Sequence, residues 1–441
     1  MHQYRLSRLV VAVSLSVAAT SAFAGSQNAL SARSFSMGGT GVAIAHPSSA
    51  TSINPAMLAA DHHEWSDDFG LALPSFNVRL ADEEEVINQV DDIQDEIDRF
   101  DALVSSIQTL SPSQQNTDAL ASSAIDLRGR LVNFDKDTIR ANLGLGLALA
   151  VPGKTLAVGF FTNASLNATV RGELASGDSA LLDTIVSAAQ TGDSAATQAA
   201  IDAAPTDSDG NIRFNSRGRI LASAVGEFGI SFAHEFNLEN GNALQLGVSP
   251  KYVELRTFQY SESVAGFDDN DFDGDAYQTD KSGFNLDIGA AYEFGEDKKW
   301  NAGIAVKNLI PMELDSAASR PALGENIRTF KLDPTATLGI AHRSEFHVVT
   351  AEIDLTEKQA FGFEDDTQWL ALGAEFDAWR YTQLRAGVRH NLASNNDNKG
   401  IEEKTQFTAG LGLNLAGARL DLGALYSDAD LGAAIELGVA F

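Results

Sequence analysis

The 441-residue sequence contains no cysteine, which excludes disulfides, thiolate catalysis and cysteine-ligated metal sites. It has only 31 lysine and arginine residues against 60 aspartate and glutamate residues, so its formal charge is −29. A nucleic-acid partner is not expected, because phosphate binding requires clustered positive charge. No stretch reaches the ~18 uncharged apolar residues of a membrane-spanning helix. Any passage through a membrane would therefore use β-strands.

The beginning of the chain has the features of a secretory signal peptide. Arg5 and Arg8 precede an apolar run over residues 9–18, and Ala22 and Ala24 supply the small side chains expected before a cleavage site. We therefore predict that residues 1–24 are a signal peptide.

The last stretch, residues 431–441, alternates strictly between apolar and other residues. One face carries Leu431, Ala433, Ile435, Leu437, Val439 and Phe441, whereas the other carries small residues and Glu436. A period of two indicates a strand, and a wholly apolar face suits a strand that meets lipid. The stretch resembles the closing strand of a bacterial outer-membrane barrel, a group whose chains typically end in Phe.

Similar alternation recurs along the chain. The predicted strands cover residues 69–80, 139–151, 155–168, 219–235, 243–256, 283–294, 300–309, 330–342, 346–355, 368–376, 382–391, 405–414, 418–426 and 431–441. Short connections alternate with longer ones, as periplasmic turns and external loops do in outer-membrane barrels. We predict an all-β fold over residues 69–441, a 14-stranded antiparallel transmembrane barrel in the bacterial outer membrane. Both termini would be periplasmic, and lipid and lipopolysaccharide would surround the wall.

Two long connections, residues 81–138 and 169–218, are expected to contain helices. In the first, apolar residues recur every three or four positions, which predicts an amphipathic helix. These residues are Val90, Ile93, Ile97, Phe100, Val104 and Ile107. Such a stripe usually packs against the protein itself, and the alternative is a surface that binds a partner.

The segment before the first strand, residues 25–68, is rich in small residues. It contains Met37, Gly38, Gly39 and Gly41, followed by Asn54, Pro55 and Ala56. The glycines follow no strand and lack the lysine of a phosphate-binding loop, so nucleotide binding is not expected. Taken alone, they could serve only for tight packing against the barrel wall.

These motifs resemble those of FadL-type outer-membrane channels for hydrophobic compounds and, more closely, those of the TraF-like family of predicted conjugal transfer proteins. The resemblance implies that residues 25–68 fold into the barrel as a hatch, with Asn54, Pro55 and Ala56 near its core.

Charged residues on the inward face of the strands are expected in the lumen. They are Lys251, Asp287, Lys307, Glu352, Arg385, Arg389, Asp421 and Glu436. Buried charges without partners are costly, so we expect a cross-strand ion network that steadies the hatch. The alternative is that these residues line a polar permeation route or a gate.

An acidic external loop matches a calcium-binding pattern. Asp269, Asp271, Asp273 and Asp280 occupy ligand positions, and Gly274 stands at the sharp turn. The loop predicts a Ca²⁺ site, and the alternative is a solvated acidic loop. No other cofactor is expected.

No nucleophile motif or catalytic set is present, so the protein is not expected to be an enzyme. The FadL-type resemblance implies passive uptake of hydrophobic small molecules, which requires an apolar pocket and a break in the barrel wall. Pro250 indicates such a break, because proline cannot complete a ladder of hydrogen bonds. The TraF-like resemblance implies the alternative, a conjugal transfer or envelope component without transport activity.

Overall fold

Antiparallel strands close into a single barrel of 14 strands, which confirms the predicted fold class. The barrel closes because β1 (Gly70–Ala81) pairs on one side with β2 (Thr138–Val151) and on the other with β16 (Asp430–Ala440). The remaining wall strands are β3 (Ala157–Glu173), β4 (Arg217–Asn237), β5 (Ala243–Ser263), β6 (Gln278–Phe294), β7 (Trp300–Lys307), β10 (Thr335–Arg343), β11 (His347–Asp354), β12 (Trp369–Ala378), β13 (Thr382–Asn391), β14 (Thr405–Leu415) and β15 (Ala418–Tyr426). Closure leaves no free sheet edge in the barrel.

The computed structural model describes residues 31–60, 70–82, 86–109, 113–207, 210–265, 274–378, 381–394, 401–415 and 417–440. The predicted signal peptide, residues 1–24, and Phe441 lie outside these residues. The signal peptide therefore remains a prediction.

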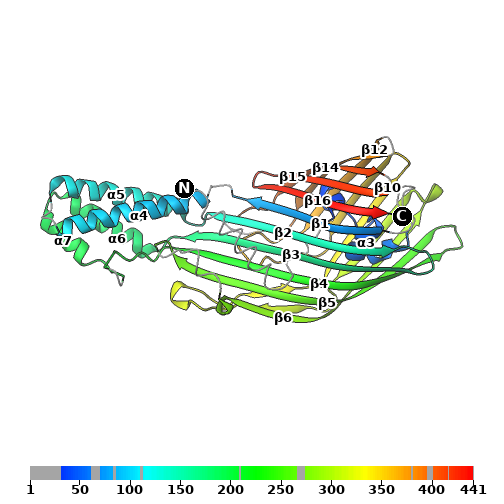
Figure 1. The fold of residues 1–441 in the computed structure, drawn as a ribbon, viewed down its shortest axis with the longest axis horizontal. Coiled ribbons are helices and arrows are strands. Elements are labelled where there is room, and N and C mark those ends of the chain that lie inside the picture. Colours follow the sequence, from blue (N-terminus) through cyan, green and yellow to red (C-terminus); the bar gives the residue numbers. More distant parts are fainter. Residues whose placement is uncertain are drawn as a thin grey trace.

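The two ends of the barrel differ. At one end, the turn end, neighbouring strands are joined by short connections such as residues 152–156, 238–242 and 295–299. At the other, the loop end, the long connections carry the helices (Figure 1). The wall is tallest along β4 and β5, which have 21 residues each, whereas β7 and β11 have eight. At ~3.3 Å per residue, β4 is longer than a tilted strand needs to cross a bilayer.

The outward face of the wall is apolar. On β4, Phe228, Phe232 and Phe236 are exposed, and Phe228 lies level with Tyr252 on β5 and Phe284 on β6. Exposed aromatic and aliphatic side chains at this density suit a surface that meets hydrocarbon, with aromatics at its borders.

One predicted strand is wrong in its extent. The alternation predicts a single strand over residues 330–342, but β9 (Thr329–Leu332) pairs with β8 (Met312–Asp315) in a separate hairpin, and β10 begins only at Thr335. Pro334 stands between β9 and β10. Proline lacks the backbone N–H that a continuous strand would use, so the ladder restarts after it.

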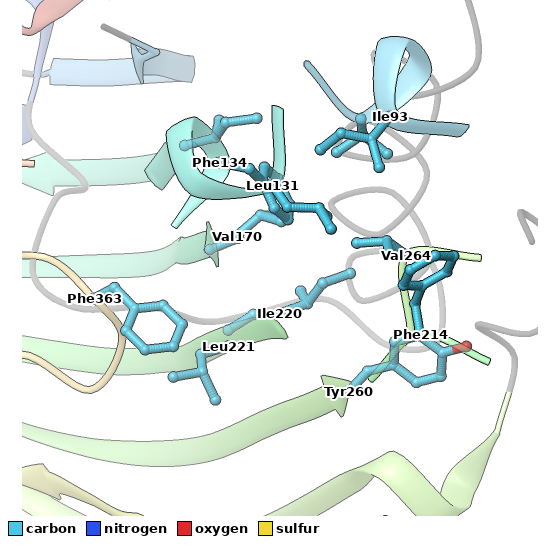
Figure 2. Packing of buried hydrophobic residues seen from close by; sticks show 14 of the residues in the cluster. Ile93, Leu131, Phe134, Val170, Phe214, Ile220, Leu221, Tyr260, Val264 and Phe363 are labelled. Carbon is cyan, nitrogen blue, oxygen red and sulfur yellow. The ribbon is translucent and has the colours of Figure 1, made fainter. Parts of the chain in front are cut away.

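Four helices project from the loop end: α4 (Val86–Thr109), α5 (Gln114–Phe134), α6 (Ser176–Gln190) and α7 (Ser194–Asp202) (Figure 1). The apolar stripe of α4 is buried. The hydrophobic core around this stripe continues into the barrel mouth. Ile93, Phe134, Ile220 and Phe363 belong to one hydrophobic cluster (Figure 2). Among the helices in the described ranges, none is long and apolar enough to cross a bilayer.

Residues 31–60 form a plug in the turn-end half of the barrel, and we use that name for them below. The plug contains α2 (Ala32–Ser36), α3 (Pro47–Ile53) and the short 3₁₀ helix η1 (Pro55–Leu58) (Figure 1). Its helices pack against strands on several sides of the barrel, including β2, β5, β6 and β15.

Candidate functional site: the plugged lumen

The plug packs against the wall where wall glycines leave room for its backbone. A Cβ atom on Gly289 of β6 would lie 1.9 Å from Asn54 Oδ1, and one on Gly387 of β13 would lie 2.3 Å from the Gly38 nitrogen. Gly38 itself has φ +74°, a conformation that other residues rarely adopt. The small residues therefore serve close packing between plug and wall.

Asn54 joins two parts of the plug and one wall strand. Its side-chain amide donates to Val42 O at 2.7 Å and to Ala290 O at 3.2 Å, and its oxygen accepts the Ala56 amide at 3.1 Å. Asn54, Pro55 and Ala56 are all buried, as is Met37. Gly39 has φ +85°, and Gly41 packs against Ile53.

Wall carboxylates hold the plug. Glu352 Oε1 accepts the backbone amides of Gly41 and Val42 at 2.8 and 2.7 Å. Elsewhere, Glu436 Oε2 accepts the Ala32 amide at 3.0 Å. Glu375 forms a two-pronged ion pair with Arg33 of the plug, with both N–O distances 2.8 Å.

Other predicted lumen charges pair with one another. Arg385 on β13 reaches Glu375 at 2.6 Å and Asp421 on β15 at 2.5 Å. On the opposite wall, Lys251 Nζ lies 2.6 Å from Glu227 and 2.8 Å from Asp287. Because each of these carboxylates has a cationic partner, the buried charges are compensated.

Lys307 and Arg389 differ from the other lumen cations. Within the described residues, neither has a carboxylate within 4.0 Å, the usual limit for an ion pair. Arg389 Nε donates to Gln406 Oε1 at 2.6 Å, and its guanidinium lies 4.3 Å from the centre of the Trp369 ring.

A second buried charge cluster is not predicted by the sequence. Arg79 on β1 and Arg140 on β2 both bind Glu403 and Asp430, and Arg79 Nη2 is 2.9 Å from each carboxylate. The cluster lies where the first and last strands close the barrel. Alternation places Arg140 inward, but Glu403 lies in the irregular segment 401–404 before β14, whose sequence carries no periodic signal.

A cavity of about 190 Å³ lies between the plug and the loop end. Gly38, Val42 and Ile53 of the plug line one side of it. The remaining wall combines charged, neutral polar and apolar residues, including the aromatic rings of Phe330, Phe361 and Trp369. The charged residues are Arg79, Arg140, Lys307, Glu352, Asp354, Lys358, Glu364, Asp365, Arg389 and Glu403. The lumen cavity is therefore lined by polar and aromatic side chains and is not apolar throughout.

The connection between β11 and β12, residues 355–368, covers this cavity at the loop end. It reaches β3, which is separated from β11 by five strands on one side of the barrel and seven on the other. The Phe363 amide donates to Thr169 Oγ1 on β3 at 3.1 Å, and the Arg171 guanidinium lies 4.3 Å from the Phe363 ring centre. This connection thus crosses the lumen.

The ladder between β4 and β5 is interrupted at Pro250, whereas on its other side Pro250 pairs with Leu286 of β6. Gly229 of β4 pairs with Lys251 of β5 and Phe232 pairs with Val248, but the two positions between them form no ladder pairs. There, Ser231 Oγ lies 2.7 Å from Ser249 Oγ and donates to Thr51 O of the plug at 3.1 Å. The interruption is therefore bridged by side chains and covered from inside by the plug.

The predicted calcium loop lies mostly outside the described residues, which do not include Asp269, Asp271 and Asp273. Asp280 lies on β6, exposed and opposite Arg256 of β5. Calcium binding remains a prediction.

The fold is similar to those of several solved channels and transporters. The structure matches the CymD monoaromatic hydrocarbon channel with a TM-score of 0.50 and 13% identity, over 95% of this chain and 99% of that chain. The Pseudomonas putida toluene transporter TodX matches with a TM-score of 0.44 and 12% identity, over 93% and 96%. A Pseudomonas aeruginosa FadL homologue matches with a TM-score of 0.44 and 10% identity, over 93% and 97%.

The sequence matches the family model described as "F plasmid transfer operon, TraF, protein" over residues 51–354, and the chain belongs to this family. No curated protein matches the sequence. Both resemblances inferred from the motifs, to FadL-type channels in fold and to the TraF-like family in sequence, are confirmed.

Proposed function

We propose that the protein is a passive outer-membrane channel for hydrophobic small molecules. The observation that carries the proposal is the combination of an apolar outward wall with a lumen that contains a separate plug and a ligand-sized cavity. Such a wall suits a bilayer, and lipid and lipopolysaccharide would be its neighbours. The turn end would face the periplasm, as would both termini, and residues 1–24 would direct export.

A route through this channel needs two movements. The connection 355–368 covers the cavity at the loop end, and the plug fills the turn end. The interruption at Pro250 offers a lateral way out of the lumen. It requires Thr51 and its neighbours, which cover it from inside, to move and the Ser231–Ser249 hydrogen bond to open.

Uptake of a labelled monoaromatic hydrocarbon by cells with and without the intact gene tests the proposal. The lipopolysaccharide leaflet slows apolar solutes, so a channel should raise the initial rate of uptake several-fold. Equal rates in both strains would reject the channel function.

The second candidate is a conjugal transfer or envelope component without transport activity. Family membership favours it, as does the helical bundle that projects from the loop end. Mating efficiency and growth on apolar carbon sources, measured on the same deletion strain, separate the two candidates. Lower mating with unchanged growth supports the second candidate, and no change in either measurement rejects both.

A further inference from the structure

We propose that the lumen cavity binds a small aromatic carboxylate, with its carboxylate on Arg389 and its ring beside Trp369. The proposal rests on the channel function above and narrows it to a substrate class. It begins from a difference in pairing among the charged residues that line the cavity: several carboxylates have internal partners, whereas Arg389 and Lys307 have no carboxylate within 4.0 Å among the described residues.

Three of the carboxylates on the cavity wall, those of Glu352, Glu403 and Asp354, are already engaged by internal partners. Glu352 accepts plug amides, and Glu403 binds Arg79 and Arg140. Asp354 accepts Thr337 Oγ1 at 2.7 Å and lies 3.3 Å from Lys358 Nζ. A cationic ligand would have to compete with these internal partners, because each of these carboxylates already has a donor.

Arg389, by contrast, has a guanidinium group that is only partly engaged by other residues. Its side chain is buried, and only its Nε donates to a described residue, Gln406. Within the described residues, the two Nη atoms have no hydrogen-bond partner, and no carboxylate lies within 4.0 Å of them. Trp369 covers one face of the guanidinium at 4.3 Å. A guanidinium that is stacked on one face and open at its Nη edge presents the parallel N–H pair that binds a carboxylate in two-pronged fashion.

A second open cation lies on another part of the cavity wall. Glu227 and Asp287, whose charges act on Lys307, are both bound by Lys251. Lys307 and Arg389 belong to β7 and β13, which are separated by β10, β11 and β12, and we assign the carboxylate contact to Arg389 because of its neighbouring ring. Lys307 would instead add positive potential along the route to Arg389.

The size of the cavity limits the ligand. An apolar protein cavity of about 150 Å³ holds one benzene molecule. A cavity of about 190 Å³ therefore fits one ring with a carboxylate but not an extended acyl chain. Trp369, Phe361 and Phe330 supply aromatic surface for the ring.

Calorimetric titration of the purified full chain in detergent tests the proposal with four probes: benzoate, toluene, benzylamine and dodecanoate. Benzoate should bind at least about tenfold more tightly than toluene and benzylamine, since a hydrogen-bonded charge pair is worth a factor of that order. Tighter binding of toluene or benzylamine than benzoate overturns the proposal. So does tighter binding of dodecanoate, or no binding of benzoate.

Variants locate the site. Arg389→Gln should weaken benzoate binding at least about tenfold, because the amide side chain cannot form the charged two-pronged pair. Arg389→Lys should give an intermediate affinity, since it keeps the charge and loses the fork. Arg343→Gln is the matched control, because Arg343 pairs with Glu293 near a turn and does not line the cavity. Unchanged binding in folded Arg389→Gln overturns the proposal.

Lys307→Gln keeps the test decisive if Arg389→Gln does not fold. It should weaken benzoate binding by a smaller factor, about twofold to fivefold, and flatten its dependence on salt concentration. A Lys307→Gln chain that binds benzoate like the unmodified chain, with the same salt dependence, argues against an anion site in this cavity.

Binding and uptake separate this inference from the proposed function. Benzoate binding to the purified chain without faster uptake of any probe by cells would retain the site and reject the channel. Faster uptake of toluene without benzoate binding would retain the channel and reject the site.

Discussion

Glu352 of the wall and Val42 of the plug are joined by a hydrogen bond of 2.7 Å, and the same carboxylate oxygen also accepts the Gly41 amide at 2.8 Å. A wall carboxylate thus holds the turn of the plug that lines the cavity. The plug amides give the buried Glu352 carboxylate the hydrogen bonds that water would otherwise provide. The same contact fixes the position of the plug relative to β11.

Glu352→Gln should loosen the plug. The charge-assisted hydrogen bonds are worth about 1.5 to 3 kcal/mol, and a neutral amide oxygen recovers only part of this. We expect larger and more frequent current steps across planar bilayers that contain the variant. Glu313→Gln is the control, since Glu313 is exposed on the β8–β9 hairpin. Identical conductance in both variants would show that Glu352 does not restrain the plug.

The packing of plug and wall predicts opposite effects for two glycine substitutions. Gly289→Ala should destabilise the plugged state by about 1 to 3 kcal/mol through overpacking, because the new methyl group meets Asn54 Oδ1. The methyl group of Gly129→Ala on α5 meets no atom within 4 Å beyond its own helix backbone and chain neighbours, so it should stabilise the helix by about 0.5 to 1 kcal/mol. Thermal unfolding and proteolysis of the plug measure both effects. Equal behaviour of the two variants would contradict close packing at Gly289.

Strand positions could be predicted from alternation, because lipid on one side and small or polar residues on the other impose a strict period of two. The period also places Glu352, Arg385 and Asp421 in the lumen. Their partners could not be predicted. Glu352 binds plug amides 309 or more residues away in the chain. Such contacts depend on how an irregular segment folds inside a closed barrel.

The limits of prediction are clearest at Glu403 and at the connection 355–368. Neither segment has a periodic sequence. Even so, Phe363 of the connection reaches β3 across the lumen, and Glu403 binds Arg140 where the first and last strands close the barrel. Pro250 is different, because the N–H that proline lacks is enough to predict an interrupted ladder on one side of that strand, which the structure shows between β4 and β5. The side chains that close the gap, Ser231, Ser249 and Thr51, are recognisable only from the packing of the plug against the wall.

A disulfide across this gap tests the lateral route. Ser231→Cys with Ser249→Cys places two thiols where the hydroxyl oxygens are 2.7 Å apart, in a chain with no other cysteine. Oxidation should lower hydrocarbon uptake to the rate of cells without the protein, and reductant should restore it. The Ser231→Cys single variant controls for the substitution. Full uptake by the oxidised double variant would place the exit elsewhere.

The acidic loop before β6 predicts a calcium site. Titration of the purified chain with Ca²⁺ should show one binding event, which Asp271→Ala and Asp273→Ala should abolish because hard cations need converging carboxylates. Asp297→Ala, in the turn after β6, is the matched acidic control. Binding that survives both loop substitutions would assign the ion to another place, and no binding would leave the loop as a solvated segment.

Burial raises the pKa of Asp101, on α4 of the helical bundle, to about 6 from an ordinary value of 3.8, although the Ile212 amide partly offsets the effect. Asp101 Oδ1 has no hydrogen-bond partner among the described residues. The folded bundle therefore favours the protonated acid. As pH falls from about 6 toward 4, the folded state binds a proton while the unfolded chain stays ionised, so stability rises.

Asp101→Asn should remove this dependence. At pH 7.5 the variant bundle should be more stable by about 1 kcal/mol, a value reduced from the full shift because the side chain is only half buried. Near pH 4 the difference should approach zero, since the native carboxyl is then neutral. Protease cleavage rates within α4 at both pH values measure the effect, with Asp126→Asn on the exposed face of α5 as control. A stabilisation that is equal at both pH values would mean that Asp101 acts through packing and not through its charge.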